Sequence, residues 1–338
     1  MSVVPVFDGH NDVLMKLTRQ SQGTAGLRRF LDGHPEWHID LPKAREGGFA
    51  GGLFALFAPL DPAAISGDVD AHAARSDLDR EIAALFRLER ISDGAIKVCR
   101  THAELRSAIA AGQLAVVIHI EGIEAIDVDL DALELFYAAG LRSLGPVWAR
   151  PNAFAHGVPP RMNATPDIGP GLTAAGKELV RACNALGVMI DLSHLNEQGF
   201  WDVARISVKP LVATHSNAHA LCPHSRNLTD RQLDAIRDSC GLVGVNYATG
   251  MLREDGLRTA DTSIDVVIRH VDYLLERLGV AGVALGSDFD GTIVPAELGN
   301  VAGQQKIVQA LRSFGYDEAL VRRICHGNWL EMLEKTWG

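Results

Sequence analysis

Short apolar runs recur along the 338-residue chain, and segments with helical periodicity separate most of them. The runs are nearly continuous in hydrophobicity and rich in Val, Ile, Leu and Phe, which is typical of strands buried on both faces of a parallel sheet. The eight runs are Val3–Phe7, Gly51–Phe57, Ala115–Ile120, Arg142–Val147, Val188–Leu192, Leu211–Thr214, Leu242–Asn246 and Val283–Gly286. Eight strands that alternate with helices predict a closed (β/α)8 barrel, the TIM barrel. The alternative is an open doubly wound sheet, but its usual glycine-rich nucleotide-binding motifs are absent.

Helix signals between the runs support this alternation. A Ser or Thr opens two of the helical segments and a Gly closes them, as caps do: Thr173 to Gly187 and Ser263 to Gly279. Two further segments have helical character, and one segment rich in Pro, Asn and Gly predicts a long loop: 70–91, 317–335 and 149–172. No repeat or linker divides the chain, so we expect residues 1–338 to form a single barrel domain.

Composition limits the possible partners. The formal net charge is −10, and the sequence lacks the basic stripe that nucleic-acid binding requires. An acidic surface disfavours anionic lipid, and no run approaches the ~18 apolar residues needed to span a bilayer. The N-terminus lacks a secretory signal pattern, and the five cysteines are scattered without a CxxC pair, which suits a reducing compartment. We therefore expect a cytoplasmic protein that binds neither nucleic acid nor a membrane.

Metal-binding and acid–base side chains follow five of the predicted strands. In barrel enzymes the active site lies at the carboxyl ends of the strands, so these side chains should meet. They are Asp8, His10 and Asp12 after the first strand, Glu121 after the third, Asp191 and His194 after the fifth, His215 after the sixth, and Asp288 and Asp290 after the last. Buried charges are costly unless they are paired or bind a metal, and nitrogen and oxygen donors suit zinc.

The spacing of these residues favours two metal ions. His10 and Asp12 are two residues apart, so both point the same way in extended chain and can bind one ion. His194 and His215 come from neighbouring strands and can bind a second, while Glu121 could bridge the two. Two such ions would polarise a carbonyl and generate a bridging hydroxide near neutral pH. Asp288 would then take a proton from the water and pass it to the leaving amine.

These motifs resemble those of the renal (membrane) dipeptidase family of amidohydrolase-like metal barrels. The matching motifs appear in family order over nearly the whole chain: Asp8-Gly-His10-Asn-Asp12, Glu121-Gly122, Asp191-Leu-Ser-His194, His215-Ser216, Ser225-Arg226-Asn227 and Gly286-Ser287-Asp288-Phe-Asp290-Gly291. The resemblance implies a zinc-dependent dipeptidase, with relatives that are often dimers and that tolerate a D-residue at the C-terminal position.

The resemblance also implies the roles of individual residues. It assigns two zinc ions per subunit to the five ligands named above, with Glu121 bridging, and proton transfer to Asp288. It further implies that Arg226 binds the substrate's C-terminal carboxylate, which suits the bidentate fork of a guanidinium.

The chain departs from the family pattern at one position. Mammalian relatives have a histidine after strand 4 that contacts the substrate carbonyl oxygen, and Trp148 stands there in this sequence. We expect His156, or alternatively Arg150, on the same loop to supply this contact to the substrate. The departure concerns oxyanion stabilisation and substrate preference and leaves the metal ligands intact.

Other polar residues near the strand ends have plainer interpretations. We expect His119 to pack beneath the metals or to support a ligand, and Asp290 to cap the turn that follows it. The pair His34 and His38 has a metal-like spacing but lies next to Pro35, which favours a loop without metal. His219 and His224 are expected to line the cleft without binding metal.

Two other functions remain open from the residues alone. The first is another amidohydrolase reaction, on N-acyl amino acids or cyclic amides. Barrels of that kind commonly begin with His-x-His and often use a modified lysine as the bridge, whereas this chain has His10-x-Asp12 and Glu121. The second is a metal-dependent binding protein without catalysis, which the intact Asp288 and ligand set disfavour.

Overall fold

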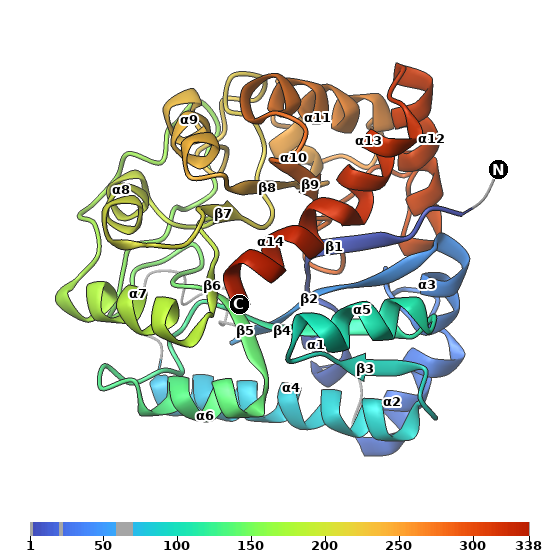
Figure 1. Cartoon of the computed structure of the whole chain (residues 1–338), viewed down its shortest axis with the longest axis horizontal. Helices are drawn as coiled ribbons and strands as arrows, with labels where there is room; N and C mark the ends of the chain where they lie inside the picture. The colour runs from blue at the N-terminus through green and yellow to red at the C-terminus, as the bar shows by residue number, and fades with distance from the viewer. Residues whose placement is uncertain (1–2, 20–22, 59–69, 338) are drawn as a thin grey trace.

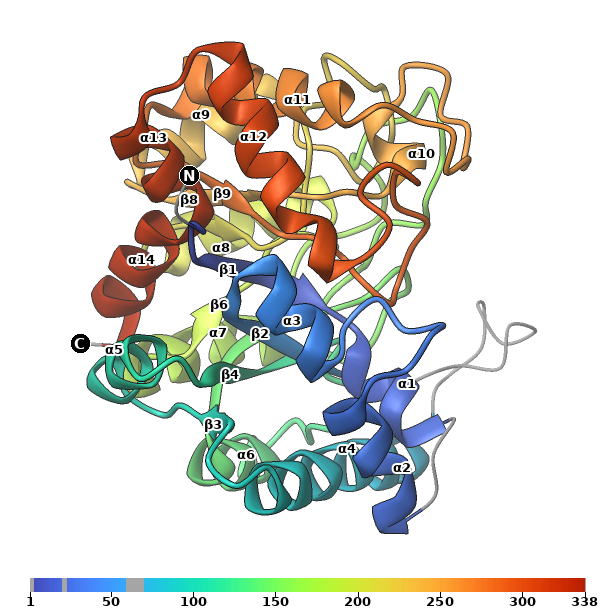
Figure 2. The same cartoon turned by 90° about the vertical axis from the view of Figure 1, so that its right-hand side faces the viewer.

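The computed structural model describes residues 3–19, 23–58 and 70–337, and its strands are all parallel to their neighbours. The strands of this part of the chain lie at the centre of the molecule, with helices around them (Figures 1 and 2). They are β1 (Val6–Asn11), β2 (Phe49–Phe57), β3 (Ile96–Val98), β4 (Leu114–Glu121), β5 (Leu141–Gly145), β6 (Met189–Ile190), β7 (Val212–Ala213), β8 (Leu242–Val245) and β9 (Val283–Leu285).

Two sheets curl together into the predicted (β/α)8 barrel. One sheet has the order β1-β2-β4-β5-β6 with β3 on the edge of β4, and the other has the order β7-β8-β9. The backbone of Asp191, just after β6, pairs with Val212 of β7, and Asn11 of β1 pairs with Phe289, in the segment that follows β9. These two seams close the ring, so the fold predicted from the alternating runs is confirmed.

Helices surround the barrel on its outer side. They are α1 (Val13–Arg19), α2 (Gly23–Asp32), α3 (Leu41–Gly47), α4 (Ala71–Ile91), α5 (His102–Ala110), α6 (Asp131–Ala139), α7 (Ala174–Leu186), α8 (Glu197–Ile206), α9 (Asp230–Asp238), α10 (Thr249–Leu252), α11 (Ile264–Leu278), α12 (Gln304–Phe314), α13 (Glu318–Arg322) and α14 (Asn328–Trp337). No helix among the described residues is both long enough and apolar enough to cross a bilayer.

The predicted helix boundaries follow the capping signals. The Thr173 side chain accepts a hydrogen bond from the backbone N–H of Gly176 at 3.1 Å, and Gly187 ends α7 in the left-handed conformation. Ser263 caps α11 in the same way. The helix predicted at 317–335 is interrupted, because a π-helical turn at Arg323–Gly327 separates α13 from α14. Residues 149–172 form the expected loop, without a helix or a strand of their own.

Helix α14 closes the amino-terminal end of the barrel. Its Trp329 is fully buried and donates a hydrogen bond from Nε1 to the carbonyl of Leu285 at 2.8 Å. The indole lies so close to the strands that a Cβ at Gly9 would be 2.4 Å from it and one at Gly244 3.1 Å. The two glycines therefore leave room for the apolar side chains of α14 inside this end of the barrel. The polar carboxyl ends of the strands lie at the opposite end.

Candidate metal centre

The strand ends bring the predicted ligands to one mouth of the barrel. His10 lies within β1, Asp12 follows that strand directly, and Glu121 is the last residue of β4. His194 and His215 follow β6 and β7 in short segments without regular structure. All five side chains are nine-tenths buried or more. Parallel pairing explains this convergence, since the strands of a barrel share one carboxyl-end rim.

Glu121 stands at the centre of the group. Its Oε1 lies 2.9 Å from Nε2 of His194, 3.4 Å from Nε2 of His215 and 3.7 Å from Nε2 of His10. His10 Nε2 is also 3.6 Å from Oδ2 of Asp12. The donor atoms therefore form two groups that share Glu121, namely His10, Asp12 and Glu121, and Glu121, His194 and His215.

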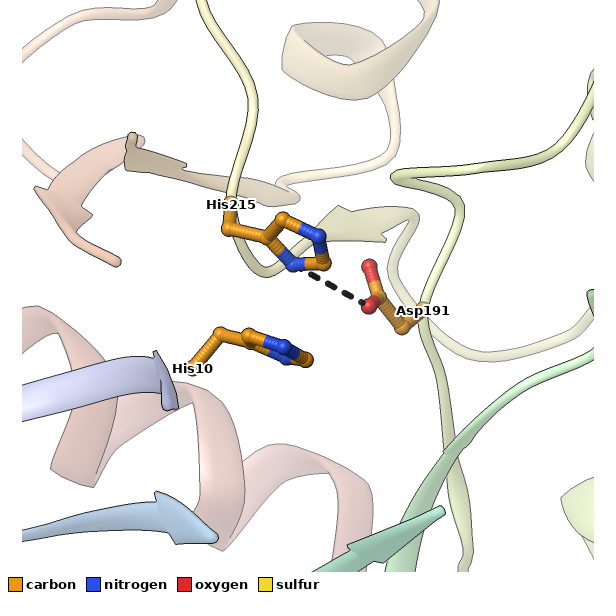
Figure 3. A group of neighbouring side chains, drawn as sticks. All are labelled: His10, Asp191 and His215. Carbon is orange, nitrogen blue, oxygen red and sulfur yellow. Dashed lines mark ion pairs between the residues drawn. The ribbon is translucent and has the colours of Figure 1, made fainter. Parts of the chain in front are cut away.

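A third group of possible ligands is His10, Asp191 and His215 (Figure 3). The rings of His10 and His215 face each other, with centroids 3.9 Å apart and planes 30° from parallel. Asp191 lies beside His215, with Oδ2 3.8 Å from Nδ1 of that ring. Its carboxylate accepts hydrogen bonds from the backbone N–H and the hydroxyl of both Ser193 and Thr214. Those four donors occupy most of its acceptor capacity, so Asp191 suits a supporting role better than metal ligation.

Several buried nitrogens of the cluster have no hydrogen-bond partner among the described residues. They are Nδ1 and Nε2 of His10 and Nδ1 of His194. A buried polar atom without a partner costs free energy, so native structures rarely keep one without a reason. An imidazole nitrogen that faces carboxylates and lacks a partner is the arrangement expected where a divalent ion binds.

The carboxylate charges at the mouth of the barrel favour a bound cation. Burial lowers the pKa of His10, but the negative charges of Glu121 and Asp12 outweigh it and raise that pKa to about 10. Burial raises the pKa of Glu121, yet the charge of His10 and hydrogen bonds with His194 and His215 hold it well below its usual value. The carboxylate of Glu121 thus stays ionised and favours a positive charge beside it in a buried site.

The other imidazoles of the mouth are held neutral. Burial and the positive charge of Arg226 together lower the pKa of His194 to about 4. Burial and the charge of His10 lower the pKa of His215 well below its ordinary value. Burial likewise lowers the pKa of His119 to about 4, with partial opposition from Asp191. A neutral imidazole is the form that binds a metal.

Asp288 lies beside this cluster in the left-handed conformation, with φ 59°. Its Oδ2 accepts a hydrogen bond from Nδ2 of Asn246 at 2.9 Å. Burial and the negative charge of Asp12 raise its pKa to about 7. Gly291 leaves room for both carboxylates, since a Cβ there would lie 2.0 Å from Asp12 Oδ2 and 2.6 Å from Asp288 Oδ1. Asp288 is therefore a carboxyl group able to hold or release a proton near neutral pH.

Arg226 reaches the same cluster from the loop after β7. Its side chain is 4% exposed, and Nη2 lies 3.2 Å from Nε2 of His215. Its Nη1 has no hydrogen-bond partner among the described residues. Burial lowers the guanidinium pKa to about 10, and the charges of Glu121 and Asp288 oppose that shift, so the group stays positive at neutral pH. A buried guanidinium with free donors is suited to bind a small anionic group.

Trp148, Arg150 and His156, which were predicted to contact substrate, lie in the segment that follows β5. The indole of Trp148 has its centroid 6.2 Å from the ring of His194 and 5.3 Å from that of Phe57. Arg150 is buried, lies over the Trp148 ring at 5.5 Å, and pairs with Glu124 at 3.0 Å. The His156 ring lies against Gly169, inside the 149–172 loop.

The histidines and the aspartate with plainer predicted roles have clear partners. His119 lies under His10, edge to face at 5.4 Å, and its Nδ1 is 2.9 Å from the hydroxyl of Ser143. Asp290 accepts hydrogen bonds from the backbone N–H groups of His38 and Ile39, so it fixes the 33–40 loop instead of its own turn. The other three histidines, His34, His219 and His224, lie in loops. The His219 ring is hydrogen-bonded to the carbonyl of Ala164, and the His224 ring accepts a hydrogen bond from the backbone N–H of Arg226.

Three residues that contact the site have supporting contacts that the sequence does not predict: Asp191, which was expected only as a polar strand end, and Thr214 and Asn246, which had no expected role. Asp191 and Thr214 bond each other at 2.6 Å, and Asn246 holds Asp288. All three are polar residues at the ends of predicted strands, which was a usable signal. Their partners come from other strands, so only the closed barrel reveals the contacts.

Comparisons with known proteins agree with this site. The family model for membrane dipeptidase (peptidase family M19) matches residues 1–337. A metallo peptidase from Rhodobacter sphaeroides, solved with a phosphinate mimic of the dipeptide L-Ala-D-Ala, is 49% identical, with a TM-score of 0.96 over 99% of this chain and 100% of that one. The dipeptidase AC, an M19 metallo peptidase, is 50% identical, with a TM-score of 0.96 over 100% of both chains. An amidohydrolase from Pseudomonas aeruginosa, 21% identical, shares the fold with a TM-score of 0.80 over 99% of this chain and 97% of that one.

Proposed function

Since the chain belongs to the membrane dipeptidase family, peptidase family M19, and is a metallo-dipeptidase, we propose that its site holds two zinc ions bridged by Glu121. His10 and Asp12 would hold one ion, and His194 and His215 the other. The observation that carries the proposal is the single oxygen, Glu121 Oε1, within 3.7 Å of three imidazole Nε2 atoms. The unpartnered nitrogens of His10 and His194 and the nitrogen and oxygen donors fit zinc. When bound, a zinc pair makes water a strong nucleophile near neutral pH and polarises the amide carbonyl.

Asp288 moves the proton in this proposal. Its Oδ2 is held by Asn246, so the proton is carried at Oδ1, next to Gly291. The carboxylate takes a proton as the nucleophile attacks the amide and gives it to the leaving nitrogen. A carboxyl pKa near the working pH serves both directions of this transfer, and nearby divalent cations would lower the metal-free value of about 7.

Arg226 selects the substrate by its free carboxylate. Its buried guanidinium stands next to His215, so a carboxylate bound there is one residue away from the amide that is cleaved. A longer C-terminal extension would place uncharged peptide against a buried positive charge, which is unfavourable. We infer that the substrates are dipeptides. The mimic of L-Ala-D-Ala bound by the Rhodobacter sphaeroides relative supports the inclusion of L,D-dipeptides.

Trp148 and Arg150 form the wall of the mouth on the side of β5, and we propose that they contact the N-terminal residue of the dipeptide. We propose that His156 contacts the substrate carbonyl oxygen, with Arg150 as the alternative. The His156 ring lies against Gly169 of the same loop.

The proposed role of His156 is tested by His156→Ala. If the imidazole stabilises the oxyanion, kcat falls by about 10²- to 10³-fold, the typical cost of one such donor. Arg150→Met is the matched variant for the alternative. An unchanged kcat in His156→Ala removes His156 from the mechanism, and a loss confined to Arg150→Met transfers the role to that residue.

The proposed function as a whole is tested by zinc content and a substrate panel. We expect purified enzyme reconstituted with zinc to bind two ions per chain and to hydrolyse L-Ala-D-Ala and L,L-dipeptides. N-acetyl amino acids and cyclic amides should be poor substrates. Glu121→Gln should lose both ion binding and hydrolysis. Full zinc loading without hydrolysis of any dipeptide would contradict the proposal and favour a binding protein, and preference for N-acyl amino acids would favour another amidohydrolase reaction.

A further inference from the structure

Asp191 contacts His215 through two hydroxyl groups. The Ser193 hydroxyl lies 2.6 Å from Asp191 Oδ1, and the Thr214 hydroxyl lies 2.6 Å from Asp191 Oδ2. The same two hydroxyl oxygens contact His215, Ser193 at the backbone N–H at 3.0 Å and Thr214 at ring Nδ1 at 2.8 Å. All four residues of this relay are buried. One carboxylate therefore fixes both the backbone and the ring of His215.

The directions of these hydrogen bonds follow from the number of protons. Asp191 receives four donors, which suits an ionised carboxylate that accepts only. The Thr214 hydroxyl has a single proton, and its 2.6 Å contact with Asp191 uses it. The Thr214 oxygen can then only accept from His215, so the ring proton is at Nδ1.

The other ring nitrogen gives an independent indication. Arg226 Nη2 lies 3.2 Å from Nε2 of His215, and a guanidinium donates hydrogen bonds but cannot accept them. Nε2 of His215 must therefore be the acceptor. The contacts with Thr214 and Arg226 assign the same tautomer. Nε2 of His215 also lies 3.1 Å from Nε2 of His194 and 3.4 Å from Oε1 of Glu121, in the space where a metal ion would bind.

We propose that Asp191 and Thr214 are positioning residues that fix the neutral Nδ1–H tautomer of His215, so that Nε2 is presented to a metal ion. The inference rests on the proposed function for its purpose, but the tautomer itself is a property of the metal-free chain. The outer partner of a ligating histidine commonly sets its orientation and basicity, and its loss typically costs about 10- to 100-fold in metal affinity.

A direct test reads the ring protons of the metal-free enzyme. Histidine labelled with ¹⁵N gives long-range ¹H–¹⁵N correlations that distinguish the two neutral tautomers, and the spectrum of His215→Gln assigns the signals of this ring. We expect Nδ1 of His215 to carry the proton at neutral pH in the wild type. A proton at Nε2 would overturn the inference. This measurement needs no bound metal, so it decides the inference even if the proposed function fails.

The second test uses zinc affinity, measured by competition with a chelator. Thr214→Val keeps the shape of the side chain but removes the hydroxyl, and we expect about a 10- to 100-fold loss of affinity for one of the two ions. Thr214→Ser keeps the hydroxyl and should restore the affinity. Asp191→Asn can donate from its amide to the Thr214 oxygen, which turns the hydroxyl toward His215 and moves the ring proton to Nε2.

Controls separate this effect from general destabilisation. Thr336→Val removes a buried, hydrogen-bonded hydroxyl from helix α14 and should leave zinc affinity unchanged. Thermal unfolding of each metal-free variant identifies any variant that fails to fold. If Thr214→Val fails to fold, the zinc affinity of Thr214→Ser is compared with that of the wild type. Wild-type zinc affinity in Thr214→Val would overturn the inference. So would the loss of one ion at saturating zinc in Asp191→Asn alone, because Asp191 would then be a ligand.

Discussion

Two carboxylates of one strand end, Asp288 and Asp290, show how a side chain's surroundings decide its role. Asp290 is occupied by the backbone N–H groups of His38 and Ile39. Asp288 is held by Asn246 at one oxygen, and burial with the negative charge of Asp12 raises its pKa to about 7. Asp288→Asn keeps the shape but cannot move the proton, so kcat should fall by about 10²- to 10⁴-fold. Steady-state kinetics on L-Ala-D-Ala, with zinc content measured in parallel, check this prediction.

Asp290→Asn is the control, since it removes a buried charge two residues away while keeping an acceptor for the loop. It should retain most of the activity. If Asp288→Asn retained wild-type kcat with both ions bound, Asp288 would not be the proton carrier.

Arg226 makes a separate prediction about selectivity. A charge-assisted hydrogen bond to the substrate carboxylate contributes about 1.5–3 kcal/mol, so the wild type should prefer a dipeptide to its C-terminal amide by about 10- to 100-fold in kcat/KM. In Arg226→Met that preference should disappear, because the acid loses its partner and the amide loses little. The two substrates are compared in both enzymes. A preference that survived the substitution would show that another group binds the carboxylate.

Helix α4 and strand β2 are joined by one buried carboxyl group, Glu81. Its Oε2 accepts a hydrogen bond from the backbone N–H of Phe57, the last residue of β2, at 2.9 Å. Burial raises the pKa of Glu81 to about 8, so the folded chain holds this proton at pH values where the unfolded chain has released it. The free energy of unfolding should therefore fall as pH rises from about 4.5 to 8.

Glu81→Gln tests this coupling of two elements. The glutamine still offers an oxygen to Phe57 but does not ionise, so the loss of stability over that pH range should become smaller. Urea unfolding at several pH values between 5 and 8 gives the comparison, with the wild type as reference. An identical pH dependence in both proteins would show that Glu81 ionises freely in the folded state.

Across the whole molecule, one of the two proposed ions connects the two sheets of the barrel. Glu121 ends β4 and His194 follows β6 of the sheet that starts at β1, whereas His215 follows β7 of the other sheet. An ion that binds only the folded chain stabilises it, by about 4 kcal/mol when its concentration is 1,000 times its Kd. Chelation should therefore lower Tm clearly in the wild type.

The same treatment of Glu121→Gln provides the control. With the shared ligand weakened, the chelator should shift Tm much less, although the substitution itself leaves the fold in place. Scanning calorimetry with and without chelator checks both proteins. Equal shifts in the two would show that the stabilising ions bind elsewhere.

The sequence by itself determined the barrel and the side chains that meet at its mouth. Apolar runs buried on both faces, separated by capped helices, allow few arrangements other than a parallel barrel, and its strand ends fixed where His10, Glu121 and His215 had to lie. Local signals also placed α7 and α11, because caps act within a few residues.

Only the tertiary structure decided how these residues are supported. Asp191 and Thr214 are 23 residues apart, and Asn246 and Asp288 are 42 apart, yet each pair is hydrogen-bonded. The sequence likewise did not predict the π-helical turn at Arg323–Gly327 or the position of the His156 ring against Gly169. Periodicity and caps report on neighbours along the chain, whereas these contacts depend on the register and closure of strands that are distant in sequence.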